Sequence, residues 1–454
     1  MRNIRIMIWG FGAMGSGIAR MIAAKRGVEI VGVADMNPNL VGKDIYEIFD
    51  MDRAGRPEVK ISGDAFEMIT PGSCDLVILA TDSFTEKAFP KIKHCVECGL
   101  NVISTAEEMS YPEAQQPELA KEIDRLAKTN GVSVFGTGIN PGFVLDLLIL
   151  ALTGTCSNVE SIEAARINDL SPFGTAVMIE QGVGLTPEEF NAKNDADDLA
   201  GHVGFPESIG LIAKGLGLEI DKVTQTKDPI VSEVERKTQY AEVKPGNVAG
   251  IRQQSYGILK DGKELIHLDH PQQILPHLEG VETGDYVTVH TGDYDVNLAI
   301  KPEIPGGVGT IAMVVNSIPH VINADKGLVH LLDMPVPRAI MGDMRDQLNP
   351  DLPQFKSHKK GDYVVIHRTV LPAGERAAGV PEDTANKPLD MWLKGFLQED
   401  AEIGDTVTVK TLIDREVEGE LTAKTAAPTH TYGEVVPELM KIHHQVKQMV
   451  RDAE

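Results

Sequence analysis

Three glycines near the amino terminus have the spacing of a dinucleotide-binding loop. Gly10, Gly12 and Gly15 form the pattern G-x-G-x-x-G between an apolar, strand-like run and a helical segment. In such a loop the first glycine permits a tight turn, the second lets the backbone approach a pyrophosphate, and the third lets helix and strand pack closely. We therefore expect a nicotinamide dinucleotide to contact Gly10, Phe11, Gly12, Ala13, Met14 and Gly15.

An acidic residue stands at the distance that this motif requires. Asp35 ends the run VEIVGVAD, twenty residues after Gly15, where a carboxylate can bind the ribose hydroxyls. The same charge would repel a 2′-phosphate, so the sequence favours NAD while NADP remains compatible with it. Thr81, Asp82 and Ser83 follow a later strand-like run. We expect them in the same ligand-binding crevice, although Asp82 and Ser83 could instead serve as helix N-caps.

Hydride removal from an amine or alcohol carbon needs a group that accepts the accompanying proton. Glu107 and Glu108 follow another strand-like run, and His202 stands just before Gly204 and Pro206. Histidine changes its charge near neutral pH, although a single histidine is more often structural. These three residues are the catalytic candidates, and the sequence leaves open which of them is the base.

The segment Asn140-Pro141-Gly142 is the candidate substrate site. It joins a strand-like run to an apolar helix that we expect over about 141–152, with Asn140 as its N-cap and Pro141 at its first position. A helix amino terminus beside the cofactor could hold a substrate carboxylate. Glu207, at another expected helix start, is a candidate for binding substrate.

The elements that must position these residues alternate regularly in the first part of the chain. Short apolar, β-branched runs separated by helical stretches occupy residues 4–9, 28–35, 59–62, 75–81, 101–105 and 132–138. Their nearly continuous hydrophobicity is typical of strands covered on both faces. The pattern predicts an α/β fold with a Rossmann-type doubly wound parallel sheet over residues 1–138.

The pattern changes after residue 138. We expect residues 139–305 to form an α+β substrate and dimerisation domain, in which Asp261-Gly262 marks a hairpin turn. The helical segment within 306–345 is expected to pack back on the first domain. Residues 346–358 have linker composition. Residues 359–454 predict a small, mostly β domain with a terminal helix over about 436–450.

Composition limits the classes of partner. The chain of 454 residues carries a formal charge of −24, which argues against nucleic acid and against an anionic membrane surface. Four cysteines make no disulfide framework, and the first residues show no export signal, so we expect a cytoplasmic protein. Cys95 and Cys98 have C-x-x-C spacing but no second pair. We expect them to be packing residues, and we expect no metal.

Five stretches of the first 345 or so residues resemble the 2,4-diaminopentanoate dehydrogenases, relatives of dihydrodipicolinate reductase. They are GFGAMGSGIAR, STAEEMSYP, GTGINPGFVLD, GHVGFPES and GGVGTIAMVVNSIPHV. The resemblance implies NAD(P)-dependent oxidative deamination of a small diamino acid at C4 in ornithine degradation, giving 2-amino-4-oxopentanoate and ammonia. On this reading the Asn140–Gly142 segment would hold the carboxylate, and Glu107 or Glu207 the C2 amine.

The C-terminal segment, which begins KKGDYVVIHRTVL and contains MWLKGFL and AEIGDTV, resembles the alpha subunit of 2-amino-4-ketopentanoate thiolase. The resemblance implies a natural fusion of consecutive enzymes and a partner, the thiolase beta subunit, which would carry pyridoxal phosphate on a separate chain. Lys394 within WLKGF is no evidence for a Schiff base here. We expect the dehydrogenase part to form a homodimer.

Two alternatives remain. The first is a dihydrodipicolinate-reductase-like enzyme or another small amino-acid dehydrogenase, although those reductases are much shorter and carry a histidine-rich, lysine-bearing loop that this sequence lacks. The second is a scaffold that senses NAD without catalysis. The glycine motif and Asp35 suit both classes, and only turnover separates an enzyme from a sensor.

Overall fold

A computed structural model describes residues 2–53, 55–349, 352, 357–377, 379–422, 446, 449 and 452. The chain divides into a larger unit, Asn3–Asn349, and a smaller unit that holds the described C-terminal residues. We describe each unit by itself. Much of the predicted linker, 346–358, and most of the helix predicted near 436–450 lie outside the described residues.

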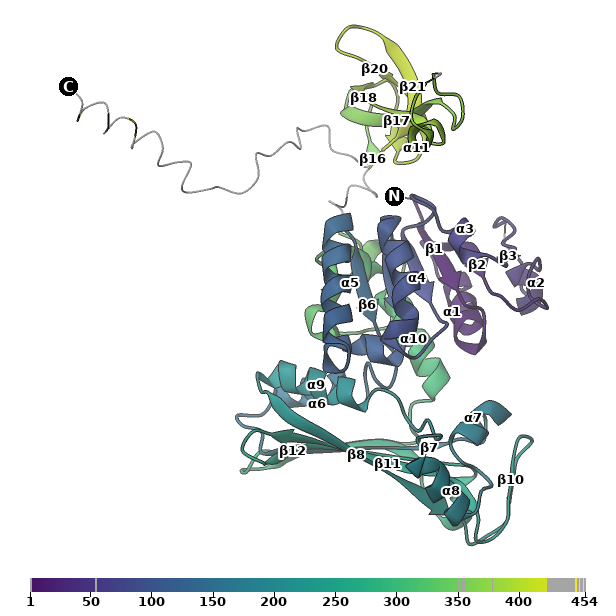
Figure 1. The fold of residues 1–454 in the computed structure, drawn as a ribbon, viewed down its shortest axis with the longest axis vertical. Coiled ribbons are helices and arrows are strands. Elements are labelled where there is room, and N and C mark those ends of the chain that lie inside the picture. The colour runs from purple at the N-terminus through teal and green to yellow at the C-terminus, as the bar shows by residue number, and fades with distance from the viewer. Residues whose placement is uncertain are drawn as a thin grey trace. The chain divides into compact units, whose positions relative to one another are not determined.

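The larger unit contains a seven-stranded sheet in the order β15-β6-β5-β4-β1-β2-β3. Figure 1 labels β6, β1, β2 and β3 of this sheet. Every neighbouring pair is parallel. The strands are β1 (Ile4–Trp9), β2 (Val28–Ala34), β3 (Ile61–Ser62), β4 (Leu76–Leu79), β5 (Asn101–Ser104), β6 (Ser133–Gly136) and β15 (Gly327–Val329). The predicted doubly wound parallel sheet is therefore confirmed.

Helices cover both faces of this sheet. They are α1 (Ala13–Ala23), α2 (Ile45–Phe49), α3 (Ala65–Met68), α4 (Thr85–Glu97), α5 (Pro117–Asn130) and α10 (Gly306–Asn323). Met7 and Trp9 of β1 share a buried cluster with α4 and α5, whereas Ile8, which alternates to the other face, lies towards α1. Helix α10 packs against α1 and also contacts β5 and β6, so residues from both ends of the larger unit's sequence cover this sheet.

The second sheet of the larger unit is mixed, with the order β14-β13-β7-β12-β11-β8. Its strands are β7 (Ser161–Asp169), β8 (Ile220–Val231), β11 (Val248–Leu259), β12 (Glu264–Gln273), β13 (Gly284–His290) and β14 (Asp295–Ile300). Helices α6 (Leu147–Thr153) and α9 (Phe205–Leu216) pack on it through an apolar core that includes Ile149, Phe205 and Ile266. The remaining elements are α7 (Thr175–Glu180), α8 (Pro187–Asp195), β9 (Arg236–Lys237) and β10 (Glu242–Val243).

Local signals predicted part of this second sheet. Asp261 and Gly262 form the turn of the antiparallel hairpin of β11 and β12, with Gly262 at φ +85°, which confirms the predicted hairpin. The edge strands β8 and β14 were not predicted. Both are only partly buried, so their sequences lack the continuous apolar runs of the parallel sheet.

The smaller unit is a closed barrel of four strands, which fits the predicted small β domain. The strands are β17 (Tyr363–Leu371), β18 (Leu389–Leu397), β20 (Thr406–Lys410) and β21 (Glu416–Leu421). A short pair, β16 (Ser357–His358) and β19 (Ala401–Glu402), and the single turn α11 (Glu382–Ala385) complete it. Its core contains Val364, Ile366, Leu397 and Val409.

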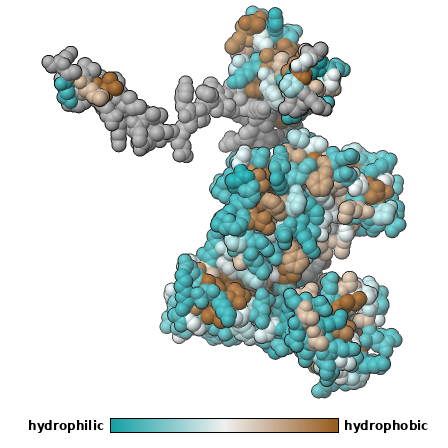
Figure 2. Space-filling model, viewed as in Figure 1, coloured by the Kyte–Doolittle hydropathy of each residue, from teal (hydrophilic) through white to brown (hydrophobic). Residues whose placement is uncertain are grey.

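Hydrophobic residues on the face of the larger unit shown in Figure 2 gather in separate spots among hydrophilic ones. Within the described part of the chain, no helix combines the length and the apolar character needed to span a bilayer.

Candidate active site

The glycine loop turns between β1 and α1 with no room for side chains at two of its three glycines. Gly10 has a φ of +97°, and a Cβ there would lie 2.6 Å from the carbonyl oxygen of Ala80. A Cβ on Gly15 would lie 1.8 Å from the carbonyl oxygen of Gly10, whereas one on Gly12 would meet no atom within 4 Å. Gly12 therefore leaves open space at the start of α1, as a bound pyrophosphate requires.

Asp35, which follows β2, binds the backbone of this loop. Its Oδ2 accepts the backbone N–H of Phe11 at 2.6 Å, and its Oδ1 accepts that of Asn37 at 2.8 Å. A carboxylate has about four acceptor positions, so Asp35 keeps acceptor capacity for ribose hydroxyls. Its contact with a nucleotide stays a prediction.

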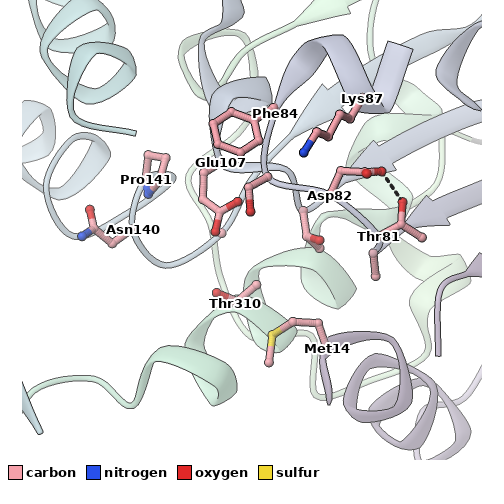
Figure 3. Close-up of a pocket in the computed structure, with 13 residues that line it drawn as sticks. Met14, Thr81, Asp82, Phe84, Lys87, Glu107, Asn140, Pro141 and Thr310 are labelled. Carbon is pink, nitrogen blue, oxygen red and sulfur yellow. Dashed lines mark hydrogen bonds between the residues drawn. The ribbon is translucent and has the colours of Figure 1, made fainter. Parts of the chain in front are cut away.

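A pocket of about 420 Å³ opens where the carboxyl ends of β4, β5 and β6 meet the starts of α1 and α10 (Figure 3). Residues predicted from sequence line much of it: Met14, Thr81, Asp82, Ser83, Glu107, Asn140 and Pro141. The other lining residues are Ala80, Phe84, Lys87, Thr105, Gly138 and Thr310. The carboxyl end of a parallel sheet is where such folds bind their ligands.

Glu107 points into this pocket from a short 3-10 helix, Glu107–Ser110, that follows β5 (Figure 3). Burial raises the pKa of its carboxyl above the ordinary value, and a hydrogen bond with the Ser83 side chain partly offsets that shift. A carboxyl group with a raised pKa is a better proton acceptor than an ordinary surface glutamate.

The neighbouring Glu108 is directed elsewhere. Its side chain is buried, and its Oε2 accepts the backbone N–H of Thr85 at 2.7 Å, where α4 begins. It is absent from the pocket lining. The structure thus separates two adjacent glutamates that the sequence could not distinguish, although the catalytic role of each stays a prediction.

Two lysines of α4 contact or belong to the residues that line the pocket. Lys91 forms an ion pair with Asp82, whose carboxylate also accepts a hydrogen bond from Thr81. Lys87 lines the pocket, with its ammonium 5.3 Å from the centre of the Phe84 ring. Asp82 therefore already has a positive partner.

The prediction that a helix begins at the segment Asn140–Gly142 is wrong. The helix expected over about 141–152 begins at Leu147, as the seven-residue α6, and its N-cap is Asp146. Gly142 has a φ of +126°, which no helix accommodates, and a Cβ there would lie 2.4 Å from the backbone nitrogen of Gly138. Asn140 is therefore no N-cap and Pro141 no first helical residue, and no helix amino terminus is present there to hold a carboxylate.

Asn140 nevertheless has unpaired polar atoms. Its side-chain Oδ1 and Nδ2 are both buried and have no hydrogen-bond partner in the described part of the chain. Pro141 beside it lines the pocket, and the start of α10 supports the segment, because the Thr310 hydroxyl accepts the N–H of Ile139 at 3.1 Å. An amide that offers both a donor and an acceptor is suited to a polar ligand.

His202 lies outside the pocket lining. Its ring packs edge-on against Phe205, 4.9 Å away, and against His270, 5.0 Å away. Burial lowers the pKa of His202 to about 3, so its imidazole is neutral. Its Nε2 has no hydrogen-bond partner among the described residues. A catalytic role for His202 stays a prediction.

Glu207 is fully buried in the first turn of α9. Its Oε1 accepts the Gln115 side-chain N–H at 2.9 Å, and its Oε2 has no partner in the described residues. Burial raises the pKa of this carboxyl to about 7. The glycine before this helix lies against the substrate segment, since a Cβ on Gly204 would be 2.4 Å from Pro141.

Sequence reasoning missed a buried cation on the second sheet. In β7, Ile162, Ala164 and Arg166 alternate onto the buried face. Arg166 donates from Nη1 to Asp285 at 2.5 Å and from Nη2 to the carbonyl of Ile304 at 2.6 Å. A charge at a core-facing position of an alternating strand was the available signal.

Arg166 belongs to a polar cluster at the start of α10. A Cβ added at Gly306 would lie 3.9 Å from Nη2 of Arg166. A Cβ added at the next residue, Gly307, would lie 3.3 Å from Met14, which lines the pocket. His270 contacts the carbonyl of Arg166 through Nδ1 at 2.6 Å, and the buried Oδ1 of Asn168 has no partner among described residues. Arg166 therefore lies beside the start of α10, and the cluster does not line the pocket.

Of the C-x-x-C residues, Cys95 lies on α4 and Cys98 is the C-cap that follows it. Cys95 is fully buried in the apolar cluster between α4 and the sheet, and burial raises the pKa of its thiol and of the thiol of Cys98. The described residues contain no group of three or more histidine, cysteine or acidic side chains arranged to hold a metal ion.

Family models match three successive segments of the chain. Residues 4–130 match the model described as dihydrodipicolinate reductase, N-terminus. Residues 143–350 match the 2,4-diaminopentanoate dehydrogenase C-terminal domain. Residues 357–450 match AKP thiolase subunit OrtA.

Individual relatives agree with these segments. A 2,4-diaminopentanoate dehydrogenase of Acetoanaerobium sticklandii is 53% identical over 352 residues, which cover 77% of this chain and 99% of that protein. A 2-amino-4-ketopentanoate thiolase alpha subunit of the same organism is 50% identical over 91 residues, 20% of this chain and 90% of that subunit. The solved amine dehydrogenase of Mycobacterium smegmatis superposes with a TM-score of 0.65 at 25% identity, covering 75% of this chain and 98% of that one.

Proposed function

The chain belongs to the 2,4-diaminopentanoate dehydrogenase family, and on this premise we propose that its larger unit oxidatively deaminates 2,4-diaminopentanoate at C4. The diamino acid, NAD(P)⁺ and water give 2-amino-4-oxopentanoate, ammonia, NAD(P)H and a proton. The observation that carries the proposal is one pocket that joins Met14 of the glycine-loop segment, the carboxyl of Glu107 and the amide segment at Asn140.

The glycine loop fits the cofactor. The open space at Gly12 and the amino terminus of α1 would hold the pyrophosphate, and Asp35 the ribose hydroxyls. When bound, the nicotinamide supplies the hydride acceptor. Because Asp35 would repel a 2′-phosphate, we propose NAD as the preferred cofactor. Measuring kcat/KM with NAD⁺ and NADP⁺ tests this preference, and equal values would refute it.

Glu107 is the proposed base. An amine can lose hydride from its carbon only after its nitrogen has lost a proton, and the carboxylate of Glu107 would accept that proton from the C4 ammonium. Its raised pKa increases its affinity for the proton. Water then adds to the C4 iminium, and ammonia leaves. The hydrogen bond with Ser83 fixes the carboxyl in place.

The rest of the substrate needs a partner for its carboxylate and one for its C2 amine. We propose that Asn140 holds the carboxylate, because its unpaired amide belongs to a residue that lines the pocket. We propose the buried guanidinium of Arg166, beside the start of α10, as a second partner that would supply positive charge. Glu207 would bind the C2 ammonium, whose charge its unpaired Oε2 could neutralise. We propose that the neutral His202 supports this region from outside the pocket lining, through its contact with Phe205 at the start of α9.

We propose that residues 1–138 together with 306–345 form the nucleotide domain, and that residues 139–305 bind substrate and make a homodimer. The helix-free face of the second sheet carries a stacked pair, Tyr256 and His267, with ring centres 4.6 Å apart. An aromatic surface of this kind suits a subunit interface. Sedimentation or light scattering of the intact protein measures the oligomeric state.

The smaller unit is proposed to bind a separate thiolase beta subunit that carries pyridoxal phosphate. The support is its likeness to an alpha subunit over nearly that subunit's full length. The fusion would keep the dehydrogenase beside the enzyme that consumes its product. Purification of the full chain together with a coexpressed beta subunit tests the association, and separate elution of the two would contradict it.

Initial-rate NAD⁺ reduction by the full chain tests the activity. The substrates are 2,4-diaminopentanoate, ornithine, 2,6-diaminopimelate and simple amino acids. Turnover only with diaminopentanoate supports the proposal. Preference for another amino acid would favour a different dehydrogenase, and cofactor binding without any turnover would favour an NAD-sensing scaffold.

A further inference from the structure

Asp146 is a fully buried carboxylate that uses both of its oxygens. Its Oδ1 accepts the backbone N–H of Leu147 at 2.6 Å and so caps α6. Its Oδ2 is directed away from that helix, where it accepts the backbone N–H of Gly142 at 2.6 Å and the hydroxyl of Ser208 at 3.2 Å. A helix cap needs only the first of these hydrogen bonds.

The two groups bound by Oδ2 belong to the two segments that flank the proposed substrate position. Gly142 lies two residues after Asn140, in the turn that leads from β6 towards α6. Ser208 follows Glu207 directly in the first turn of α9. The same two segments meet where Gly204 packs against Pro141. A single carboxylate oxygen thus links the backbone that presents Asn140 to the helix that presents Glu207.

This link restrains two segments that carry unpaired polar atoms. The polar atoms of Asn140 and Oε2 of Glu207 have no partner among the described residues, so hydrogen bonds at these atoms do not hold them. Gly142, with its φ of +126°, adopts a backbone conformation that residues with a side chain rarely adopt. A charge-assisted hydrogen bond at 2.6 Å is among the stronger restraints available to such a turn.

We propose that Asp146 is a positioning residue for the deamination, which sets the spacing between Asn140 and Glu207 through its hydrogen bonds to Gly142 and Ser208. This inference rests on the proposed function, because it gives the two segments a common substrate. Asp146 touches no reacting atom. It acts by holding the substrate's two anchoring groups at one separation, and small errors in such geometry have large effects on rate.

The test compares Asp146→Asn and Ser208→Ala with the wild-type full chain. An asparagine offers one acceptor oxygen and a donor amide, so it cannot accept all three hydrogen bonds. We expect Asp146→Asn to raise the KM for 2,4-diaminopentanoate by about 10-fold or more and Ser208→Ala by about 3-fold, in line with the loss of charged and neutral hydrogen bonds. The Kd for NAD⁺ should stay within about 2-fold of wild type, because the glycine loop is untouched.

Double variants separate positioning from simple stabilisation. If Asp146 acts through Asn140, adding Asp146→Asn to an Asn140→Ala enzyme should change KM far less than adding it to the wild type. Full additivity would overturn the proposal. Because Asp146→Asn can reduce folding, Ser208→Ala in the Glu207→Gln background gives a second cycle with a milder change, and additivity there counts equally against it.

Matched controls come from buried residues that do not line the pocket. Asp44→Asn removes a buried aspartate that accepts the N–H of Val59, and Ser255→Ala removes a buried hydroxyl of β11. Both should lower thermal stability without changing the KM for substrate. If Asp146→Asn behaves as Asp44→Asn does, its role is only structural and the proposal is wrong. Failure of the wild-type enzyme to oxidise diaminopentanoate would instead refute the proposed function.

Discussion

The cofactor side and the substrate side of the candidate site are built differently. At the glycine loop the conformation is set by backbone geometry, and the acidic side chain of Asp35 is paired with two backbone N–H groups. On the substrate side, Asn140, Glu207 and Asn168 bury polar atoms that have no partner among the described residues. Such atoms cost free energy in the folded state. The glycine loop is therefore held by hydrogen bonds within the protein, whereas the second region buries polar atoms that a bound ligand could pair.

The largest effect should come from Glu107, which stands between the two regions. Glu107→Gln removes the proposed base but keeps the shape of the side chain, so kcat should fall by about 10²- to 10⁴-fold. The Kd for NAD⁺, measured by fluorescence titration, should not change. Glu108→Gln is the matched control. It should lower thermal stability with little change in kcat, because the Glu108 carboxylate accepts the Thr85 N–H at the start of α4. A larger loss of kcat in Glu108→Gln than in Glu107→Gln would make Glu108 the base.

Glu207 gives a pH-dependent test of the substrate side. Burial raises its pKa to about 7 from the ordinary value of 4.5, so the folded state favours the protonated form. Its contribution to stability is therefore complete below the unfolded pKa and is lost as the pH rises through about 7. The loss amounts to roughly 3 kcal/mol.

Denaturant unfolding between about pH 4 and about pH 8 should reveal this contribution. The Glu207→Gln variant, which cannot ionise, should show a flatter profile than the wild type over that range. Parallel profiles for the two proteins would show that ionisation of Glu207 does not lower the free energy of unfolding. Glu207 would then not be a buried group that lacks a partner for its charge.

Two substitutions in the glycine loop should differ in their effect on thermal stability. Gly12→Ala adds a methyl group to open space, so thermal stability should be unchanged while the Kd for NAD⁺ rises by about 10-fold. Gly15→Ala forces a clash with the carbonyl of Gly10, so it should destabilise the fold as well. Thermal melts and NAD⁺ titrations of both variants distinguish the two cases. Equal loss of stability in both would mean that Gly12 serves packing and not the cofactor.

Among the substitutions that compare the two regions, Asn140→Ala should have the smallest effect on activity, and it should change KM without lowering stability. Removing an unpaired buried amide should leave stability unchanged or raise it by about 1 kcal/mol. The KM for diaminopentanoate should rise by about 5-fold, since a neutral hydrogen-bonding partner is lost. Loss of stability together with an unchanged KM would show that Asn140 serves the fold.

The cofactor side could be predicted from sequence because its signals are local. Each strand that carries Gly10, Asp35 or Thr81 at its end is a short apolar run, and the parallel arrangement brings those ends together. Even so, the sequence could not tell Glu107 from Glu108, because which of two adjacent residues faces the pocket depends on the irregular turn after β5.

The substrate side was harder to predict because its determinants are not local. Asn140-Pro141-Gly142 reads as a helix start, yet the turn continues to Asp146, which binds Ser208 sixty-two residues later in the chain. Arg166 could have been noticed as a charge at a buried position of β7, but only once its strand register was known. The pairing of Glu207 with Gln115 likewise joins distant segments.

Deuterium transfer tests the central claim most directly. The full chain is incubated with NAD⁺ and 2,4-diaminopentanoate deuterated at C4, and the reduced cofactor is analysed by mass spectrometry. Oxidative deamination at C4 predicts deuterium in the reduced nicotinamide, with ammonia and reduced cofactor formed in equal amounts. Reduced cofactor without deuterium would place the oxidation at another carbon and contradict the arrangement of Glu107, Asn140 and Glu207 proposed for this pocket.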